Sequence, residues 1–288
     1  MPVEFELCPG RRIGGSNPCF IIAEIGQNHQ GDIEIAKKLI RMAKDCGADC
    51  VKFQKSELEH RFTKRALERT YISPHSWGNT YGAHKRHLEF SHEQYRELQQ
   101  FSREVGIFFT ASGMDECTSA YPLPTEHANL RIITEFQKEF PDIPIGYSGH
   151  EGGISVSVAA VALGAKVVER HVTLDKSWKG SDHAASLEPG ELAALVREIR
   201  TVELALGSPV KQMLPCEASC HKKLGKSIVA RKAMQKGTEL TLDMLGVKVA
   251  EPQGIPAEKI FKLVGKTITV ELQEDDPIAN DMIMIAND

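Results

Sequence analysis

The sequence predicts an α/β fold built on parallel strands, followed by a small α+β domain, and three observations lead to this prediction. From residue 19 onward, short β-rich runs alternate with amphipathic stretches of helical periodicity, which is typical of a parallel sheet covered by helices. The chain has 288 residues, of which 41% are hydrophobic, so it can bury a sizeable core. Near Ser208 the alternation stops, and a segment punctuated by proline and glycine begins.

The expected elements follow one another in order, with one long loop among them. Strands are expected at 19–25, 50–55, 107–112, 143–148 and 166–172, and helices at 33–46, 92–105, 126–140, 154–163 and 190–206. The helices carry apolar residues at three- and four-residue spacing, as at Ile35, Leu39 and Ala43, with charges on the other side. The loop from Glu57 to Phe90 is long for a connection between a strand and a helix, and such loops usually cover a ligand.

The domain boundaries are expected from the change of pattern after residue 207. Residues 1–207 form the first domain, 208–221 a linker and 222–288 the second domain. In the second domain we expect a strand at 224–234, a short helix at 240–245, a loop at 252–256, a helix from Ala257 and a strand at 267–272. A domain this small is near the lower limit for independent stability, so it is expected to pack on something else.

Charge and composition exclude two classes of partner. Lysine and arginine together number 35 against 39 aspartates and glutamates, so the net charge of −4 offers no footprint for nucleic acid or an anionic membrane. The amino-terminal stretch lacks the features of a secretory signal, and the longest apolar run, 154–165, is too short to span a bilayer. We therefore expect a cytoplasmic protein with no nucleic-acid or membrane partner.

The seven cysteines are too sparse and odd in number for a disulfide framework, so reduced thiols are expected. The pairs Cys46/Cys50 and Cys216/Cys220 are spaced CxxxC, which leaves a zinc site as an alternative. Idle or buried thiols are the preferred interpretation, because neither pair has a matching second pair.

Polar side chains gather at the carboxyl ends of the expected strands, where α/β folds place functional groups. His150 and His171 end neighbouring strands and could share a divalent cation with Glu24 or Asp182 and water. The alternative is two histidines that are hydrogen-bonded to the backbone alone. An inward carboxylate at a strand end, as at Glu24, is also a plausible proton donor or acceptor, because desolvation raises its pKa.

Lys52 stands between the apolar Val51 and Phe53 on its strand, so it faces the opposite side from them. An inward lysine among polar strand ends suits a carboxylate or a phosphate, whereas a lysine snorkelling at the edge of a layer is the alternative. Lys85 and Arg86 in the long loop could hold a phosphorylated substrate, and a solvated charged helix around Arg65 is the competing interpretation. No P-loop, GxGxxG or GxSxG motif is present, so nucleotide-binding and hydrolase functions lack support.

Several segments resemble the N-acetylneuraminate (sialic acid) synthase family along essentially the whole chain. They include AEIGQNHQG at 23–31, GYSGHE at 146–151, ERHVTLDKSWKGSDH at 169–183 and LGKSIVARKAMQKGT at 224–238. The resemblance implies a (β/α)8 barrel of the TIM type, a carboxyl-terminal antifreeze-like (SAF) domain and a domain-swapped homodimer. It implies a transferase that condenses phosphoenolpyruvate with N-acetylmannosamine, or in animals with N-acetylmannosamine 6-phosphate to give N-acetylneuraminate 9-phosphate, using Mn²⁺ or Mg²⁺.

The resemblance also assigns roles to residues of this chain. His150 and His171 match the metal ligands, and Glu24 matches the acid/base glutamate. The remaining matches are Asp182 near the sugar, Lys52 as an anchor for phosphoenolpyruvate, and Thr110 and Tyr121 as further substrate positions.

The chain departs from the family in two places. Only 221 residues precede the second domain, whereas a (β/α)8 barrel typically takes ~250 residues, and strand 107–112 runs almost directly into CTSAYP at the Glu116/Cys117 junction. The family holds its fourth and fifth βα units and most of its sixth strand there, with KxGSGD-like and SSGM-like segments that grip phosphoenolpyruvate. We therefore expect a barrel that lacks two to three βα units. Glu251 stands where bacterial relatives present an arginine to the sugar of the other protomer. This difference puts that contact between protomers in doubt.

These departures keep two alternatives open. One is a catalytically inactive isoform that only binds metal or sugar, or only dimerises. The other is a metal-dependent aldolase acting on a different sugar, which the joint match of GYSGH, ERH and SDH disfavours.

Overall fold

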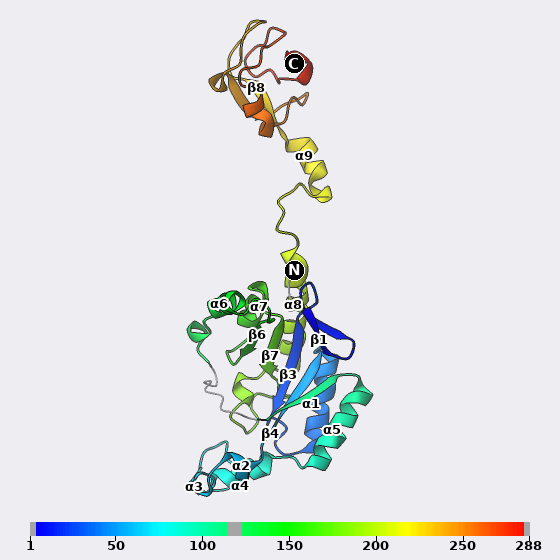
Figure 1. The fold of residues 1–288 in the computed structure, drawn as a ribbon, viewed down its shortest axis with the longest axis vertical. Helices are drawn as coiled ribbons and strands as arrows, with labels where there is room; N and C mark the ends of the chain where they lie inside the picture. Colours follow the sequence, from blue (N-terminus) through cyan, green and yellow to red (C-terminus); the bar gives the residue numbers. More distant parts are fainter. Residues whose placement is uncertain (1–3, 114–122, 285–288) are drawn as a thin grey trace. The chain divides into compact units, whose positions relative to one another are not determined.

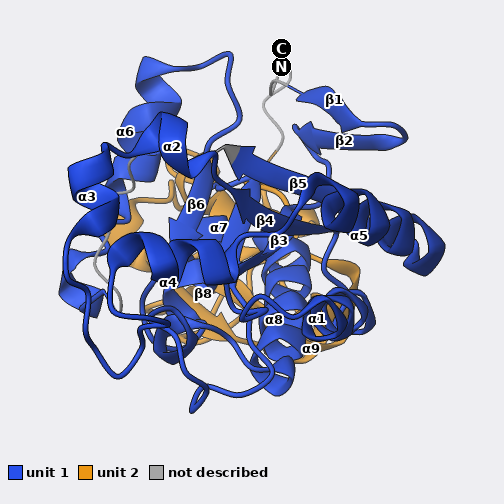
Figure 2. Cartoon of the chain, turned by 90° about the horizontal axis from the view of Figure 1, so that it is seen from below, with its two compact units in different colours: residues 1–207 blue, residues 208–288 orange. Residues whose placement is uncertain are grey.

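The computed structural model describes residues 4–113 and 123–284, which belong to two compact units at 1–207 and 208–288 (Figure 2). The Glu116/Cys117 junction and Tyr121 lie outside the described residues. Each unit is considered by itself below. In the described ranges, no helix combines the length and apolar character needed to cross a bilayer.

A five-stranded parallel sheet forms the centre of the first unit (Figure 1). Its strands, in spatial order, are β5 (Phe108–Gly113), β4 (Cys50–Lys55), β3 (Phe20–Gly26), β7 (Val167–His171) and β6 (Gly146–Gly149). The parallel α/β prediction is confirmed. The sequence prediction missed an amino-terminal hairpin of β1 (Glu4–Cys8) and β2 (Arg11–Gly14), although Pro9 and Gly10, whose φ is 76°, are typical turn residues.

Four helices cover one face of the sheet: α1 (Ile33–Asp45), α5 (His92–Val105), α7 (Ser155–Ala162) and α8 (Pro189–Leu206). Their ends follow local rules, since Asp32 caps α1, and Ser91 with Gln94 forms a capping box on α5. The helix expected at 126–140 is interrupted, because Asn129 adopts a left-handed backbone with φ of 48°. Only the turn η1 (Thr125–His127) and α6 (Arg131–Glu139) form there.

The two faces of the sheet differ because side chains alternate along each strand. Ile21, Val51 and Val168 lie on the helix-covered face and enter the main core. The opposite face is apolar near the amino ends of the strands, where Phe20 and Cys50 pack with Ile13 of the hairpin. Near the carboxyl ends that face becomes polar.

The sheet is open at both sides in the described residues, since β5 and β6 each pair with one neighbouring strand. A closed barrel would instead pair every strand on both sides. α6, which precedes β6, exposes the apolar residues Ile132 and Phe136, and Phe140 directly after it is exposed as well, by 44–48%. This stripe and the two unpaired edges are what a barrel without its middle βα units would leave uncovered.

The long loop folds into three short helices, α2 (Leu58–Arg61), α3 (Lys64–Glu68) and α4 (Tyr81–Leu88). Aromatic contacts hold them together: the ring centroids of Tyr71 and Tyr81 are 5.4 Å apart, and those of Trp77 and His84 are 5.6 Å apart. This packing brings Lys85 on α4 toward the strand ends.

The second unit contains one antiparallel ribbon, β8 (Lys226–Ala230) with β9 (Leu245–Val249), around a core that includes Ile228, Leu240 and Ile278. The other elements of this unit are η3 (Pro215–Glu217), α9 (Ala218–Leu224), η4 (Leu242–Met244), η5 (Ala257–Lys262) and η6 (Asn280–Met282). The prediction of a strand at 267–272 is wrong. Its residues make isolated bridges to three different segments, so no continuous ladder forms. The helix expected from Ala257 is a short 3-10 helix.

Candidate active site

A row of polar residues crosses four neighbouring strands near their carboxyl ends. Lys52 on β4 is the register partner of Thr110 on β5 and of Glu24 on β3, and Glu24 is the partner of His171 on β7. Register partners in a parallel sheet project to the same face. The four residues therefore lie side by side on the face that the helices do not cover.

Lys52 is held by two carboxylates. Its Nζ lies 3.1 Å from Glu24 Oε2 and 2.9 Å from both carboxylate oxygens of Glu169. Burial disfavours the ammonium, but the two carboxylates outweigh it and raise the pKa of Lys52. Sequence reasoning gave Glu169 no separate role, although its two-residue spacing from His171 on one strand was a signal that both face the site.

Glu24 is the most enclosed carboxylate of the row, with 1% of its surface exposed. Burial raises its pKa to about 7, and Lys52 only partly offsets this. Its Oε1 atom is buried and has no hydrogen-bond partner among the described residues. A carboxyl group in this state can hold or release a proton near neutral pH.

His150 lies next to His171, the β7 member of this row, with ring centroids 5.5 Å apart and planes inclined by 48°. Burial lowers the pKa of both, that of His171 to about 4, so both imidazoles are neutral at pH 7. Neutral imidazoles are the form that binds metals, and with metal–nitrogen bonds of about 2.1 Å rings at this spacing can share one ion. In the described ranges, no cluster of three or more His, Cys, Asp or Glu residues is arranged to hold a metal. His150 and His171 are thus the two protein nitrogens that this site could offer to a cation.

The turn after β3 is built against His171. Gly26 has φ of 57°, and a Cβ atom there would lie 3.1 Å from Cε1 of His171, so glycine permits both the turn and the close approach. Asn28 connects the same turn to the residue after β7 and to Ser186. Its Nδ2 donates to the Val172 carbonyl at 2.9 Å and to Ser186 Oγ at 2.8 Å.

The other predicted site residues are only partly brought together. Asp182 precedes the turn η2 (His183–Ala185), and its negative charge acts on His150, His171 and Lys85. Lys85 Nζ donates to Gln27 Oε1, in the turn after β3, at 2.9 Å, and burial lowers the pKa of this lysine. Arg86 is exposed and pairs with Glu59 at 3.0 Å, away from this contact. Thr110 is exposed on the edge strand.

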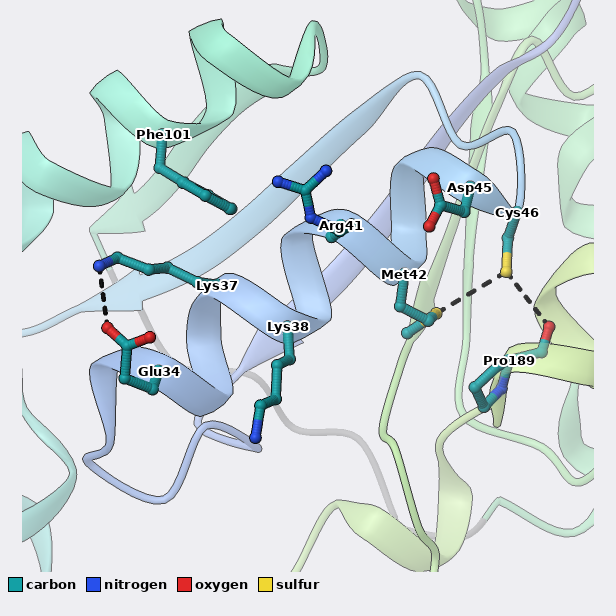
Figure 3. A pocket seen from close by; sticks show the side chains of 9 residues that line it. All are labelled: Glu34, Lys37, Lys38, Arg41, Met42, Asp45, Cys46, Phe101 and Pro189. Atoms are coloured by element: carbon teal, nitrogen blue, oxygen red, sulfur yellow. Dashed lines mark hydrogen bonds and ion pairs between the residues drawn. The ribbon is translucent and has the colours of Figure 1, made fainter.

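A separate groove of about 540 Å³ lies on the outer side of the helix layer, lined by α1, Phe101 of α5 and Pro189 (Figure 3). Two of its cations have local partners: Lys37 pairs with Glu34 at 2.9 Å, and Arg41 lies over the Phe101 ring at 5.4 Å. The groove is separated from the polar row by the sheet, because α1 covers the opposite face.

Comparison with known proteins identifies both units. The sequence pattern of the NeuB family matches residues 39–116 and 114–211, and that of the SAF domain matches residues 225–284. The N-acetylneuraminate-9-phosphate synthase of Homo sapiens is 57% identical over 350 residues, covering 98% of each chain. The Drosophila melanogaster protein of the same name is 40% identical, covering 92% of this chain and 96% of that one.

A solved structure agrees with the fold. The N-acetylneuraminic acid synthetase of Leptospira borgpetersenii serovar Hardjo-bovis has a TM-score of 0.65 and 26% identity, covering 77% of this chain and 96% of that one. The match to the human protein spans 350 residues, 62 more than the 288 present here. The two NeuB stretches meet at 114–116. On this combination of identity, coverage and fold, the chain belongs to the NeuB family of sialic acid synthases and carries a SAF domain.

Proposed function

We propose that this site is built for the condensation of phosphoenolpyruvate with N-acetylmannosamine 6-phosphate to give N-acetylneuraminate 9-phosphate. The observation that carries the proposal is the joint placement of Lys52, Glu24 and the His150/His171 pair on one face of the sheet. The names of the human, mouse and fly relatives support the product. In this reaction the enol carbon bonds to the sugar aldehyde carbon, water adds at C2, and phosphate leaves by C–O cleavage.

Each group has a role that its surroundings allow. His150 and His171 would hold Mn²⁺ or Mg²⁺, which when bound polarises the aldehyde oxygen. Lys52 supplies positive charge for the anionic substrate, and Glu169 holds its ammonium in place at 2.9 Å. Glu24, with one buried carboxyl oxygen free of hydrogen bonds among the described residues, takes up the proton that the attacking water gives up. Asp182 lies at the sugar side of the site.

A second candidate is a catalytically inactive isoform, which the open sheet favours. Calorimetry with phosphoenolpyruvate and Mn²⁺ separates the two, with Lys52→Met as the matched variant. For a synthase site, we expect phosphoenolpyruvate binding that weakens at least roughly tenfold when this charge-assisted contact is lost. No phosphoenolpyruvate binding by the parent would leave the inactive isoform as the function.

We propose Lys85, rather than Arg86, as the partner of the sugar phosphate. Lys85 contacts the turn after β3 through Gln27, whereas Arg86 is engaged at the surface by Glu59. Lys85→Ala should therefore weaken binding of N-acetylmannosamine 6-phosphate about tenfold or more while leaving unphosphorylated N-acetylmannosamine nearly unaffected. Arg86→Ala is the matched control, and calorimetry measures both. Equal losses for the two sugars, or a larger effect of Arg86→Ala, would contradict this assignment.

We propose a cytoplasmic homodimer as the working form. The family resemblance and the small size of the second unit support the dimer. Glu251, in the loop after β9, is exposed where bacterial relatives present an arginine, so any contact from this loop to the sugar would differ from theirs.

A further inference from the structure

A fully buried ion pair lies behind the two histidines. Arg170 immediately precedes His171, and Glu151 immediately follows His150. Their side chains are 1% and 0% exposed, and Arg170 Nη1 lies 2.9 Å from Glu151 Oε1. Because side chains alternate along β7, Arg170 projects to the helix-covered face while its neighbour His171 projects to the site.

The pair is hydrogen-bonded on nearly every side. Arg170 also donates to the Glu151 carbonyl at 2.6 Å and to the Gly153 carbonyl at 2.7 Å, so it holds both the side chain and the backbone of the turn after β6. The Glu151 carboxylate accepts from Tyr147 Oη at 2.8 Å and from Ser157 Oγ at 3.2 Å. A burial this complete is sustained only when the charges are paired and hydrogen-bonded.

His150 stands just past the end of a short strand. β6 is four residues long and lies at a sheet edge, and its ladder with β7 ends at the Gly149/Arg170 pair. Beyond the ladder, the His150 carbonyl accepts a backbone hydrogen bond from Leu123 at 2.9 Å. Gly149 leaves room for the Glu151 carboxylate, since a Cβ atom there would lie 2.5 Å from Oε2.

We propose that Arg170 and Glu151 are positioning residues that set the spacing of His150 and His171 and thereby the affinity of the site for a divalent cation. The inference rests on the proposed metal role of the two histidines. The guanidinium joins β7 at the residue before His171 to the turn at the residue after His150. These bonds therefore fix the distance between the backbone at His171 and the backbone at His150. They act from the face of the sheet opposite to the site.

The test must separate positioning from stability, because removing one partner leaves the other charge buried and destabilises the fold. The double variant Arg170→Met/Glu151→Met replaces both by apolar side chains, which buried pairs often tolerate. We expect it to unfold near the parent temperature and to bind Mn²⁺ at least roughly tenfold more weakly, as measured by electron paramagnetic resonance of free Mn²⁺. Arg200→Met/Glu203→Met, which removes a half-buried pair on α8, is the control and should leave Mn²⁺ binding unchanged.

A folded double variant with parent affinity for Mn²⁺ would overturn the inference. If the double variant does not fold, Arg170→Lys keeps the buried positive charge but lacks the guanidinium fork that bonds the Glu151 side chain and the Glu151 and Gly153 carbonyls together. A loss of Mn²⁺ affinity of about threefold or more supports the inference, and parent affinity overturns it. His150→Ala and His171→Ala are measured alongside. Unchanged Mn²⁺ binding in both would refute the metal role itself, which is a different failure from that of the ion pair.

Discussion

Purified protein supplied with Mn²⁺, phosphoenolpyruvate and N-acetylmannosamine 6-phosphate is expected to release phosphate more than roughly a hundredfold more slowly than the ~10 s⁻¹ of an ordinary enzyme. The polar row is assembled, but its face is open beyond β5, where Thr110 is exposed. Water on that side screens the charges of Lys52 and Glu24, and electrostatic stabilisation needs a closed, water-poor site.

The family comparison points to one place in the sequence where βα units of the barrel would be missing. The two family matches meet at 114–116, and the alignment with the human relative is 350 residues long, against 288 residues in this chain. We therefore infer that the chain lacks the βα units that close the barrel in its relatives.

Restoring these units is the control for the first prediction. Insertion of the corresponding interval of the human protein between Glu116 and Cys117 should raise turnover at least roughly a hundredfold. Glu24→Gln in the restored chain should remove most of that gain if this carboxyl group moves the proton. Turnover by the unaltered chain within about tenfold of that of ordinary enzymes would show that the open sheet does not impair catalysis. Aggregation or absent phosphate release would agree with unpaired edges and an exposed apolar stripe.

Replacing either His150 or His171 by alanine is the second change with a large expected effect, a fall in Mn²⁺ affinity of at least roughly tenfold. The proposed site has two imidazole ligands, and no cluster of three or more His, Cys, Asp or Glu residues is found among the described residues. Each replacement would therefore remove one of two protein ligands. Calorimetry with Mn²⁺ measures the affinity, and this readout does not depend on turnover.

His92→Ala provides the matched control, because His92 is exposed at the start of α5 and its side chain is 71% accessible. It should bind Mn²⁺ as the parent does. Parent-like affinity in both His150→Ala and His171→Ala would exclude the pair as metal ligands and would leave them as structural histidines.

Local patterns were sufficient for the main elements of the first unit. Alternation of β-branched runs with 3.6-residue periodicity predicted β3, β4, β5, β6 and β7 and the helices α1, α5, α7 and α8 within a few residues, but it missed the short helices α2, α3 and α4 in the long loop. The prediction was wrong where one backbone conformation overrides periodicity, as at Asn129, which shortens the expected helix. It was also wrong at 267–272, where an apolar strand-like run bridges several segments instead of pairing with one.

The sequence by itself determined which chemical groups stand at the strand ends, because the side chain at a strand end follows from alternation and motif alone. It also identified the family, and it predicts a break at Glu116/Cys117. Only the tertiary structure decided that Lys52 lies between Glu24 and Glu169 and that Lys85, not Arg86, reaches the turn after β3. The physical reason is that such contacts depend on strand register and on packing between segments far apart in the chain, which no local pattern encodes.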